Sequence, residues 1–343
     1  MQKKWMQGSL SVVVACLLGA AFLGAPAPAL AAAGEKITLK AWAFVPEKHP
    51  QARMLQWFRA AVNERAKGKL EIAWVGGPEL FKTKDIPTAV TARAVDVLSS
   101  PVGAYLSFVP EACLDAGPYW KPEYAPKMSR ELRDKVLSPA FEAKMRMKQL
   151  AYPLIVQMNV VTKKPVSTLA EMKGLTIRGT PGGIIDYIQA LGATPINLPA
   201  EEVYIALERG VIDGAARPMS SYIQFKEYEV AKHIVTTPLT YATLGLWITT
   251  DAWKKLPKDL QDIVLEEGDK FQDRMVDEFV KEYTEARKLT TGYGVTWHDL
   301  PKGDAEKWNA SVMKTAFDMI RKDVPKENAE KIISIINKYL KGS

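Results

Sequence analysis

Two arginines follow segments whose apolar residues predict β-strands. Arg178 ends the strand predicted at residues 175–178 and precedes a Gly-Thr-Pro-Gly-Gly turn that opens a helix, and Arg217 follows the strand predicted at 211–215. Ligands of open α/β sheets bind at the carboxyl ends of strands. A guanidinium offers two parallel donors that match a carboxylate, and a glycine-rich helix start adds backbone donors for an anion. Each arginine is therefore a candidate for anion binding, with a structural salt bridge as the alternative.

Other recognisable chemistry is missing from the sequence. The three histidines and two cysteines are too widely separated to predict a metal site or a disulfide framework: His49, His233, His298, Cys16 and Cys113. No segment has the spacing of a phosphate-binding glycine loop or of a nucleophile elbow. Cys113 stands between apolar residues, which is typical of a small buried residue rather than a nucleophile. The sequence therefore predicts no enzyme activity, no cofactor and no metal.

The composition is that of a globular chain. Of 343 residues, 47% are hydrophobic and 9% aromatic, which is too much apolar surface for a disordered protein. The formal net charge of +7 comes from 46 basic and 39 acidic residues spread along the chain, without a long run of like charges. This distribution argues against nucleic acid as a partner.

The first residues have the order of a secretory signal. Residues 1–8 carry two lysines and no acid, residues 9–23 are apolar, and Ala-x-Ala cleavage sites fall within 29–33. We expect a cleaved signal peptide over residues 1–33. An uncleaved membrane anchor is the first alternative, but the apolar run is shorter than the roughly 20 residues that a spanning helix needs. A lipoprotein signal at Cys16 is the second, but the apolar run continues past this residue.

Two groups of alternating strands and helices follow. The first has strands at 37–44, 70–75 and 95–98 with helices at 50–68 and 85–93, and the second has strands at 155–161, 175–178, 194–198 and 211–215 with helices at 183–191 and 201–209. This order predicts two α/β units, each with a parallel sheet and right-handed crossovers. The segment between the two groups shows no regular pattern.

The last third of the sequence predicts a strand, one long helix and a final pair of helices. Residues 239–249 are apolar, and residues 258–289 carry a helical stripe formed by Ile263, Val264, Phe271, Met275, Phe279 and Tyr283. At about 1.5 Å per residue this helix is about 45 Å long, longer than one small domain is wide. We therefore expect it to span both lobes of the molecule.

Several segments stand in the order and spacing of one protein family. They are Leu-Ala-Glu-Met-Lys-Gly-Leu-Thr-Ile-Arg at 169–178, Leu-Gly-Ala-Thr-Pro at 191–195, Glu-Val-Tyr at 202–204, Ala-Leu-Glu-Arg-Gly-Val-Ile-Asp-Gly at 206–214 and Trp-Lys-Lys-Leu-Pro at 253–257. Asp96 also matches a family position, at the end of the third predicted strand. With these segments the chain resembles the periplasmic solute-binding proteins of tripartite ATP-independent (TRAP) transporters, of the dicarboxylate-binding type. The resemblance covers essentially the whole mature chain.

The resemblance implies a two-lobed α/β periplasmic-binding-protein fold with a hinged cleft and a long helix that spans both lobes. We expect lobe I to comprise residues 34–155 plus about 244–280, and lobe II residues 156–243 plus about 281–343. In this family the arginine at the place of Arg178 usually pairs with the carboxylate of the ligand. The resemblance thus turns Arg178 from one candidate of two into the expected ligand anchor.

Two departures from the family pattern bear on the ligand. Sugar-acid binders carry a further arginine about twenty residues before Arg178, where this chain has Met158 between Gln157 and Asn159, so sialic acid and its near relatives are not expected. The family commonly has asparagine before the proline that follows Asp-Gly, where this chain has Arg217. We therefore expect a second cation on the other wall of the cleft.

Aromatic residues at the ends of predicted strands complete the set of candidate ligand contacts. Most of them are expected in the core, but those at strand ends, Phe44 and Tyr222 especially, are candidates for the wall of a flat ligand site. The predicted ligand-binding residues are Arg178, Arg217, Phe44, Met158, Tyr222, Trp247 and Tyr105. This set suits a dicarboxylate, a 2-oxo acid or an aromatic carboxylate, and the sequence does not choose among them.

The function expected from this resemblance is capture of an organic acid in the periplasm and its delivery to the integral-membrane subunits of a TRAP permease. An exported module that presents the same acid to a receptor is the main alternative, because it would use the same cleft. An exported hydrolase is disfavoured, since the sequence shows no pair of nucleophile and base and no metal ligands.

Overall fold

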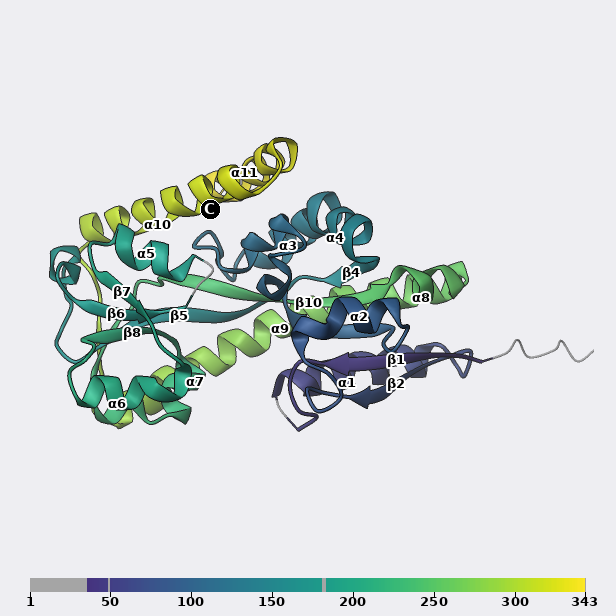
Figure 1. Ribbon diagram of the computed structural model, residues 1–343, viewed down its shortest axis with the longest axis horizontal. Helices are drawn as coiled ribbons and strands as arrows, with labels where there is room; N and C mark the ends of the chain where they lie inside the picture. The colour runs from purple at the N-terminus through teal and green to yellow at the C-terminus, as the bar shows by residue number, and fades with distance from the viewer. Residues whose placement is uncertain (1–35, 49, 181–182, 343) are drawn as a thin grey trace, which may run out of the picture. The chain divides into compact units, whose positions relative to one another are not determined.

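The computed structural model describes residues 36–48, 50–180 and 183–342 (Figure 1). The predicted signal peptide lies outside these residues. Residues from Lys36 onward form one compact unit. Among the described residues, no helix combines the length and the apolar composition required to span a bilayer.

The regular elements alternate along the chain much as the sequence predicts. The strands are β1 (Ile37–Ala43), β2 (Leu70–Gly76), β3 (Val97–Pro101), β4 (Met147–Ala151), β5 (Leu154–Thr162), β6 (Thr176–Gly179), β7 (Thr194–Asn197), β8 (Gly214–Pro218), β9 (His233–Val235), β10 (Thr240–Thr249) and β11 (Thr296–His298). The α-helices are α1 (Pro50–Arg65), α2 (Ile86–Thr91), α3 (Ala125–Leu132), α4 (Ser138–Met145), α5 (Ile184–Ala190), α6 (Val203–Glu208), α7 (Met219–Gln224), α8 (Thr250–Lys255), α9 (Lys258–Gly292), α10 (Lys302–Asp323) and α11 (Lys326–Lys341).

Eight of the strands described form one continuous path of hydrogen-bonded neighbours in the order β2-β1-β3-β10-β5-β8-β6-β7, while β4 pairs with β10, β9 with β5 and β11 with β9. The first group is parallel where β1 pairs with β2 and β3, and the second is parallel where β6 pairs with β7 and β8. The expectation of two parallel sheets is wrong for β5, which runs antiparallel to its neighbours. Strand β10, for which the sequence predicts no direction, also runs antiparallel to its neighbours. Apolar patterning reveals a buried strand but not its direction, so the sequence could not distinguish these cases.

Strand β10 belongs to both groups of strands. Its first residues, from Thr240, pair with β5, and its last residues, from Leu244 to Ile248, pair with β3 and β4. The register shifts between Ala242 and Thr243, at the transition from one group to the other. A second connection runs from β4 into β5 through Tyr152 and Pro153. Two adjacent crossings of the chain therefore join the two groups of strands.

The long helix α9 has 35 residues, which confirms the predicted helix and extends it by one turn. It packs against α1 and β4 of the first group and against β5 and α7 of the second, and Figure 1 shows it extending from one group to the other. Its stripe of buried residues includes Leu260, Val264, Phe271, Met275 and Phe279. This helix is the third element that connects the two groups.

Two regions differ from the sequence predictions. The supposedly irregular middle contains α3, α4 and a π-helical turn at Arg133–Leu137. Prolines interrupt its apolar pattern, but both helices begin with their proline in the first turn, where proline needs no amide donor. Asp96 precedes β3 rather than ending it, and its Oδ2 accepts a hydrogen bond from the backbone N–H of Lys40 at 2.9 Å.

Gly268, in the middle of α9, allows that helix to lie against β4. A Cβ atom at this position would stand 2.9 Å from the carbonyl oxygen of Leu150. We predict that Gly268→Ala lowers the free energy of unfolding by about 1–3 kcal/mol, although alanine favours helix by up to about 1 kcal/mol. Gly303→Ala in α10 is the matched control, because nothing lies within 4 Å of the added atom. Urea unfolding should leave the control unchanged or more stable, and equal stability of both variants would contradict the close packing.

Glu131 holds α11 against α3. Its carboxylate accepts from Lys135 Nζ and Lys338 Nζ at 2.7 Å and from Tyr339 OH at 2.9 Å. The hydrogen bonds from Lys135 and Lys338 lower its pKa to about 2. A lowered folded-state pKa stabilises the fold above the ordinary glutamate pKa, and this contribution is lost as pH falls toward 2. We predict that Glu131→Gln lowers the melting temperature at pH 7 but not near pH 2; an equal loss at both values would disprove the charge effect.

Candidate functional site

The register of three neighbouring strands places Arg178, Arg217 and Asn159 on one face of the sheet. Arg178 of β6 pairs with Ala215 of the parallel strand β8, and Asn159 of β5 pairs with Arg217. Residues two apart on a strand share a face, so Arg217 lies on the same face as Ala215 and hence as Arg178. The sequence prediction that both arginines stand near the carboxyl ends of strands is confirmed by β6 and β8. The expectation that Arg217 lies on the other wall of the cleft is wrong, because the register places it on the same sheet face as Arg178.

Arg178 is buried without an acid beside it. Arg178 is only 5% exposed, and its Nε donates to the carbonyl oxygen of Leu198 at 3.0 Å. Among the described residues, no carboxylate oxygen lies within 4.0 Å of its guanidinium nitrogens. Burial lowers the pKa of Arg178, and the positive charge of Arg217 lowers it further. The group remains a cation, since an arginine pKa starts from above 12.

Arg217 is paired inside the protein with Glu227, which is fully buried. Arg217 Nε donates to Glu227 Oε2 at 2.9 Å, and Nη2 lies 2.6 Å from Oε1 without the alignment of a hydrogen bond. The guanidinium also lies 5.4 Å from the centre of the Phe225 ring. Burial raises the pKa of Glu227, and the positive charges of Arg217 and of Arg178 oppose that shift. The second predicted cation thus carries its own counter-ion.

A chain of neutral polar side chains lies beside this ion pair. Gln157 Nε2 donates to Tyr283 OH at 2.8 Å and to Asn159 Oδ1 at 3.2 Å, and Asn159 Nδ2 donates to the carbonyl oxygen of Val235 at 2.9 Å. Neither Glu227 nor Tyr283 is a candidate site residue from the sequence, because their positions beside Arg217 and Asn159 depend on tertiary contacts. Two polar residues alternating with Met158 on a buried strand were a usable signal for Gln157 and Asn159, because buried polar groups require partners.

Met158 lies on the strand that carries Asn159, but its side chain points to the opposite face, since strand neighbours alternate. It is 8% exposed and belongs to the hydrophobic core on that face. The structure therefore separates Met158 from the face that carries the two arginines.

Three of the four aromatic candidates lie in the hydrophobic interior. Tyr105 and Trp247 contact each other with ring centres 4.9 Å apart, and the hydroxyl of Tyr105 is 2.6 Å from Ser100 Oγ. Tyr222 is fully buried in α7 and donates to the carbonyl oxygen of Ala231 at 2.5 Å. Phe44 is half-buried directly after β1, with its backbone N–H donating to the carbonyl oxygen of Ser99. Of these four, Phe44 has a ring that remains partly accessible.

Comparison with known proteins shows the family of this chain. Residues 43–323 match the model of the bacterial extracellular solute-binding protein family 7 (DctP). The chain belongs to this family. It is a periplasmic solute-binding protein of the TRAP type, as the sequence resemblance indicates, and not an enzyme.

Individual relatives are distant in sequence but cover most of the chain. The 2,3-diketo-L-gulonate-binding periplasmic protein YiaO of Escherichia coli is 27% identical over 277 residues, 78% of this chain and 82% of that protein. A TRAP periplasmic solute-binding protein from Rhodobacter sphaeroides, solved in an open state without ligand, has a TM-score of 0.82 at 25% identity and covers 88% of this chain and 99% of its own. One from Rhodoferax ferrireducens with bound malonate has a TM-score of 0.70 at 23% identity, over 88% and 98% of the two chains.

These likenesses confirm the two-lobed periplasmic-binding-protein fold with a long helix. The lobe boundaries given above stay a prediction, although the division of β10 between two groups of strands falls close to residue 244.

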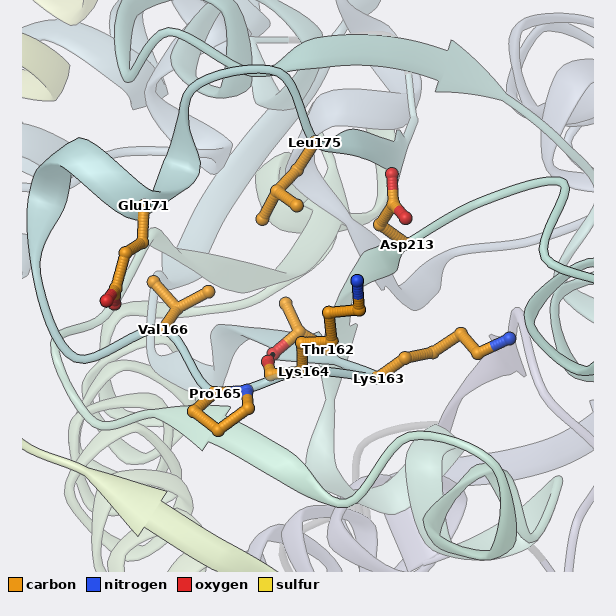
Figure 2. A pocket seen from close by; sticks show the side chains of 8 residues that line it. All are labelled: Thr162, Lys163, Lys164, Pro165, Val166, Glu171, Leu175 and Asp213. Atoms are coloured by element: carbon orange, nitrogen blue, oxygen red, sulfur yellow. Dashed lines mark hydrogen bonds between the residues drawn. The ribbon is translucent and has the colours of Figure 1, made fainter.

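A cavity of about 340 Å³ lies elsewhere on this solute-binding protein, next to the end of β5 and the starts of β6 and β8 (Figure 2). It is lined by Thr162, Lys163, Lys164, Pro165, Val166, Glu171, Leu175 and Asp213. Its two acids already accept backbone hydrogen bonds, Asp213 from Thr176 and Glu171 from Ser167. None of the predicted ligand-binding residues lines it, so we do not assign the solute site to this cavity.

The Arg217–Glu227 pair should be a cooperative unit. Glu227→Ala leaves a buried guanidinium unpaired, and we predict a loss of about 3–5 kcal/mol in the free energy of unfolding. The double variant Arg217→Ala with Glu227→Ala removes both charges and should lose less than the sum of the two single variants. Urea unfolding of the four proteins measures this coupling, and additive losses would show that the two charges do not stabilise each other.

Proposed function

We propose that this protein captures an organic acid anion between its two lobes, with Arg178 as the partner of the carboxylate, and delivers it to a TRAP permease in the membrane. The observation that carries the proposal is the buried guanidinium of Arg178, beside which no described residue places an acid. A carboxylate ligand would supply the missing counter-ion through two parallel charge-assisted hydrogen bonds.

The other two buried arginines show how unusual this is. Arg217 is paired with Glu227 as described above. Arg133 is 6% exposed and is paired with Asp134 and Asp269, both at 2.7 Å. Since a buried charge is costly unless it is paired, an arginine kept without an acid at a strand end is suited to bind one from outside.

The ligands named for relatives support an acid of small size. Solved relatives hold malonate in the Rhodoferax ferrireducens protein and pyroglutamic acid in a Bordetella pertussis receptor. In the protein from Ochrobactrum anthropi a C-terminus is bound in the ligand-binding pocket, and a chain terminus is itself a carboxylate. These molecules differ in shape but share a carboxylate, the group that Arg178 would bind in this proposal, whereas a relative from Desulfovibrio desulfuricans holds sn-glycerol-3-phosphate, which is also an anion.

Binding alone is sufficient for this function. The lobes are joined by β10, by the β4–β5 connection and by α9, so an anion that contacts both lobes would favour a closed arrangement over an open one. In this proposal Arg178 anchors the acid on one lobe, and the partly accessible ring of Phe44 offers an apolar wall on the other. The permease would recognise the rim of the closed protein.

Export is part of the proposal. A periplasmic location agrees with the family, and the cleaved signal over residues 1–33 stays a sequence prediction. N-terminal sequencing of the secreted protein should begin near residues 32–34.

Arg178→Ala should abolish or greatly weaken binding of the carboxylate. Loss of a buried charge pair costs about 2–5 kcal/mol, which corresponds to tens to thousands of fold in dissociation constant. A thermal-shift screen of the refolded mature protein against C4-dicarboxylates, 2-oxo acids and aromatic acids finds the binder, and calorimetry compares the variants. At saturating ligand the melting temperature should rise by several degrees.

Two further variants act as controls for that experiment. Arg209→Ala removes an exposed arginine at the end of α6 and should leave the affinity unchanged. Arg178→Lys keeps the charge but lacks the two-pronged donor, so its affinity should lie between those of wild type and Arg178→Ala. Wild-type affinity in Arg178→Ala would disprove the proposed anchor.

A further inference from the structure

We propose that the site selects a singly charged carboxylate over a dianion of the same size. The inference rests on the proposed function, since it takes Arg178 as the anchor of the ligand. It concerns the number of charges that the ligand carries, which the family resemblance and the ligands of relatives leave open.

The charged side chains on the sheet face that carries Arg178 and Arg217 have a net charge of +1. Arg178 and Arg217 lie on the same face of adjacent strands, with Arg217 diagonal to Arg178 across the β6–β8 pair. The two side chains are close enough for the charge of Arg217 to act on Arg178, so both cations can act on one ligand. Glu227 cancels one of them, because both of its oxygens face the Arg217 guanidinium at 2.9 and 2.6 Å. One cation is left for the ligand.

The position of Glu227 makes this cancellation strong. Glu227 is the first residue of a short helical turn that follows Lys226. Both members of the pair are buried, with Glu227 0% exposed and Arg217 2% exposed. Water therefore screens the pair little, and the carboxylate cannot rotate away into solvent. A ligand carboxylate that approached Arg217 would have to displace Glu227 or lie beside its negative charge, and both are unfavourable.

The one cation that acts on the neighbouring polar side chains among the described residues is Arg287, which influences Tyr283 but is exposed to solvent and lies 5.1 Å from the centre of the Trp297 ring. Gln157, Asn159 and Tyr283 are neutral, and they hydrogen-bond to one another. Two acids act on Arg178 from further away, the buried Glu227 and the exposed Glu201, and neither supplies a positive charge.

The strand ends of the other group add no net charge either. The segments after β1 and β2, at 44–48 and 76–82, each contain one acid and one lysine. The segment after β3, at 101–108, contains neither. A second ligand carboxylate would therefore be desolvated without a cation to pair with it, whereas an amide, hydroxyl or keto group at the same place carries no such penalty.

Pairs of ligands that differ by one charge test this directly. We would titrate the wild-type protein at pH 7.5 with malonate, succinate and glutarate and with the half-amide of each, which keeps the shape and removes one charge. Monocarboxylates such as pyroglutamate, 2-oxo acids and aromatic acids complete the panel. The tightest binder should be a monoanion, and each half-amide that binds should be at least about tenfold tighter than its dianion.

The outcomes separate this inference from the function on which it rests. A dianion that binds tightest, and loses its binding in Arg178→Ala, overturns the inference and leaves carboxylate capture standing. A panel without any binder that depends on Arg178 overturns carboxylate capture, and the inference with it.

Changing the charge count inside the protein provides a second test. Glu227→Gln keeps a hydrogen-bonding group beside Arg217 but frees its charge, so the ratio of dianion to monoanion affinity should rise at least about tenfold. The double variant Arg217→Gln with Glu227→Gln returns the face to one cation and should restore the preference for monoanions. An unchanged ratio in a folded Glu227→Gln protein would disprove the role of Glu227. If Glu227→Gln does not fold, the inference is still tested by the affinities of the wild-type protein for each dianion and its half-amide, and by the same affinities in the double variant.

Discussion

A guanidinium inside a protein is stabilised by an acid beside it, and Arg178 has none among the described residues. The fold keeps it there through short-range geometry: strand β6 is held between β7 and β8, and the carbonyl of Leu198 fixes the Nε of Arg178 at 3.0 Å. The neighbouring Arg217 does not relieve the charge, since it is itself a cation. The surrounding residues therefore leave a buried positive charge with which an anion from solvent can pair.

The mixed direction of the strands follows from the need to connect two groups of strands more than once. A chain that passes from one group to the other along β5 and returns along β10 must run antiparallel to itself at the crossing. The two crossings are adjacent and hydrogen-bonded to each other, while α9 crosses separately and packs against both groups. Adjacent strands can bend together, whereas a 35-residue helix resists bending, so α9 limits the ways in which one group can move relative to the other.

Local patterns were enough to predict the periodic elements. Strands β1 and β2, helix α1 and the long helix α9 were found from apolar spacing, because each buries one stripe or face. Helices α3 and α4 were missed, because prolines near their starts break the pattern although the first turn tolerates them. The sequence also predicted the wrong direction for β5 and no direction for β10, since strand direction depends on the path of the whole chain.

The part of the candidate site that depends on local sequence was also predictable. Arg178 was found because a strand, an arginine and a glycine-rich turn are adjacent in sequence. The role of Arg217 could not be read in the same way, because its partner Glu227 comes from a separate turn beyond α7. The aromatic candidates Tyr105, Tyr222 and Trp247 follow or form buried strands, so position at a strand end did not distinguish a ligand wall from the core.

Arg178 also links affinity to stability. In the protein without ligand, the charge of Arg178 is desolvated and close to another cation. This lowers the free energy of unfolding relative to a protein with an apolar residue at that position. A bound carboxylate removes that cost as well as adding its own contacts, so the ligand stabilises the folded protein by more than its contacts alone would suggest. The pairing of Arg217 with Glu227 limits the same cost, because two unpaired cations on one sheet face would repel each other in every molecule without ligand. The charge balance that suits a single carboxylate is thus also the balance that lets the free protein stay folded.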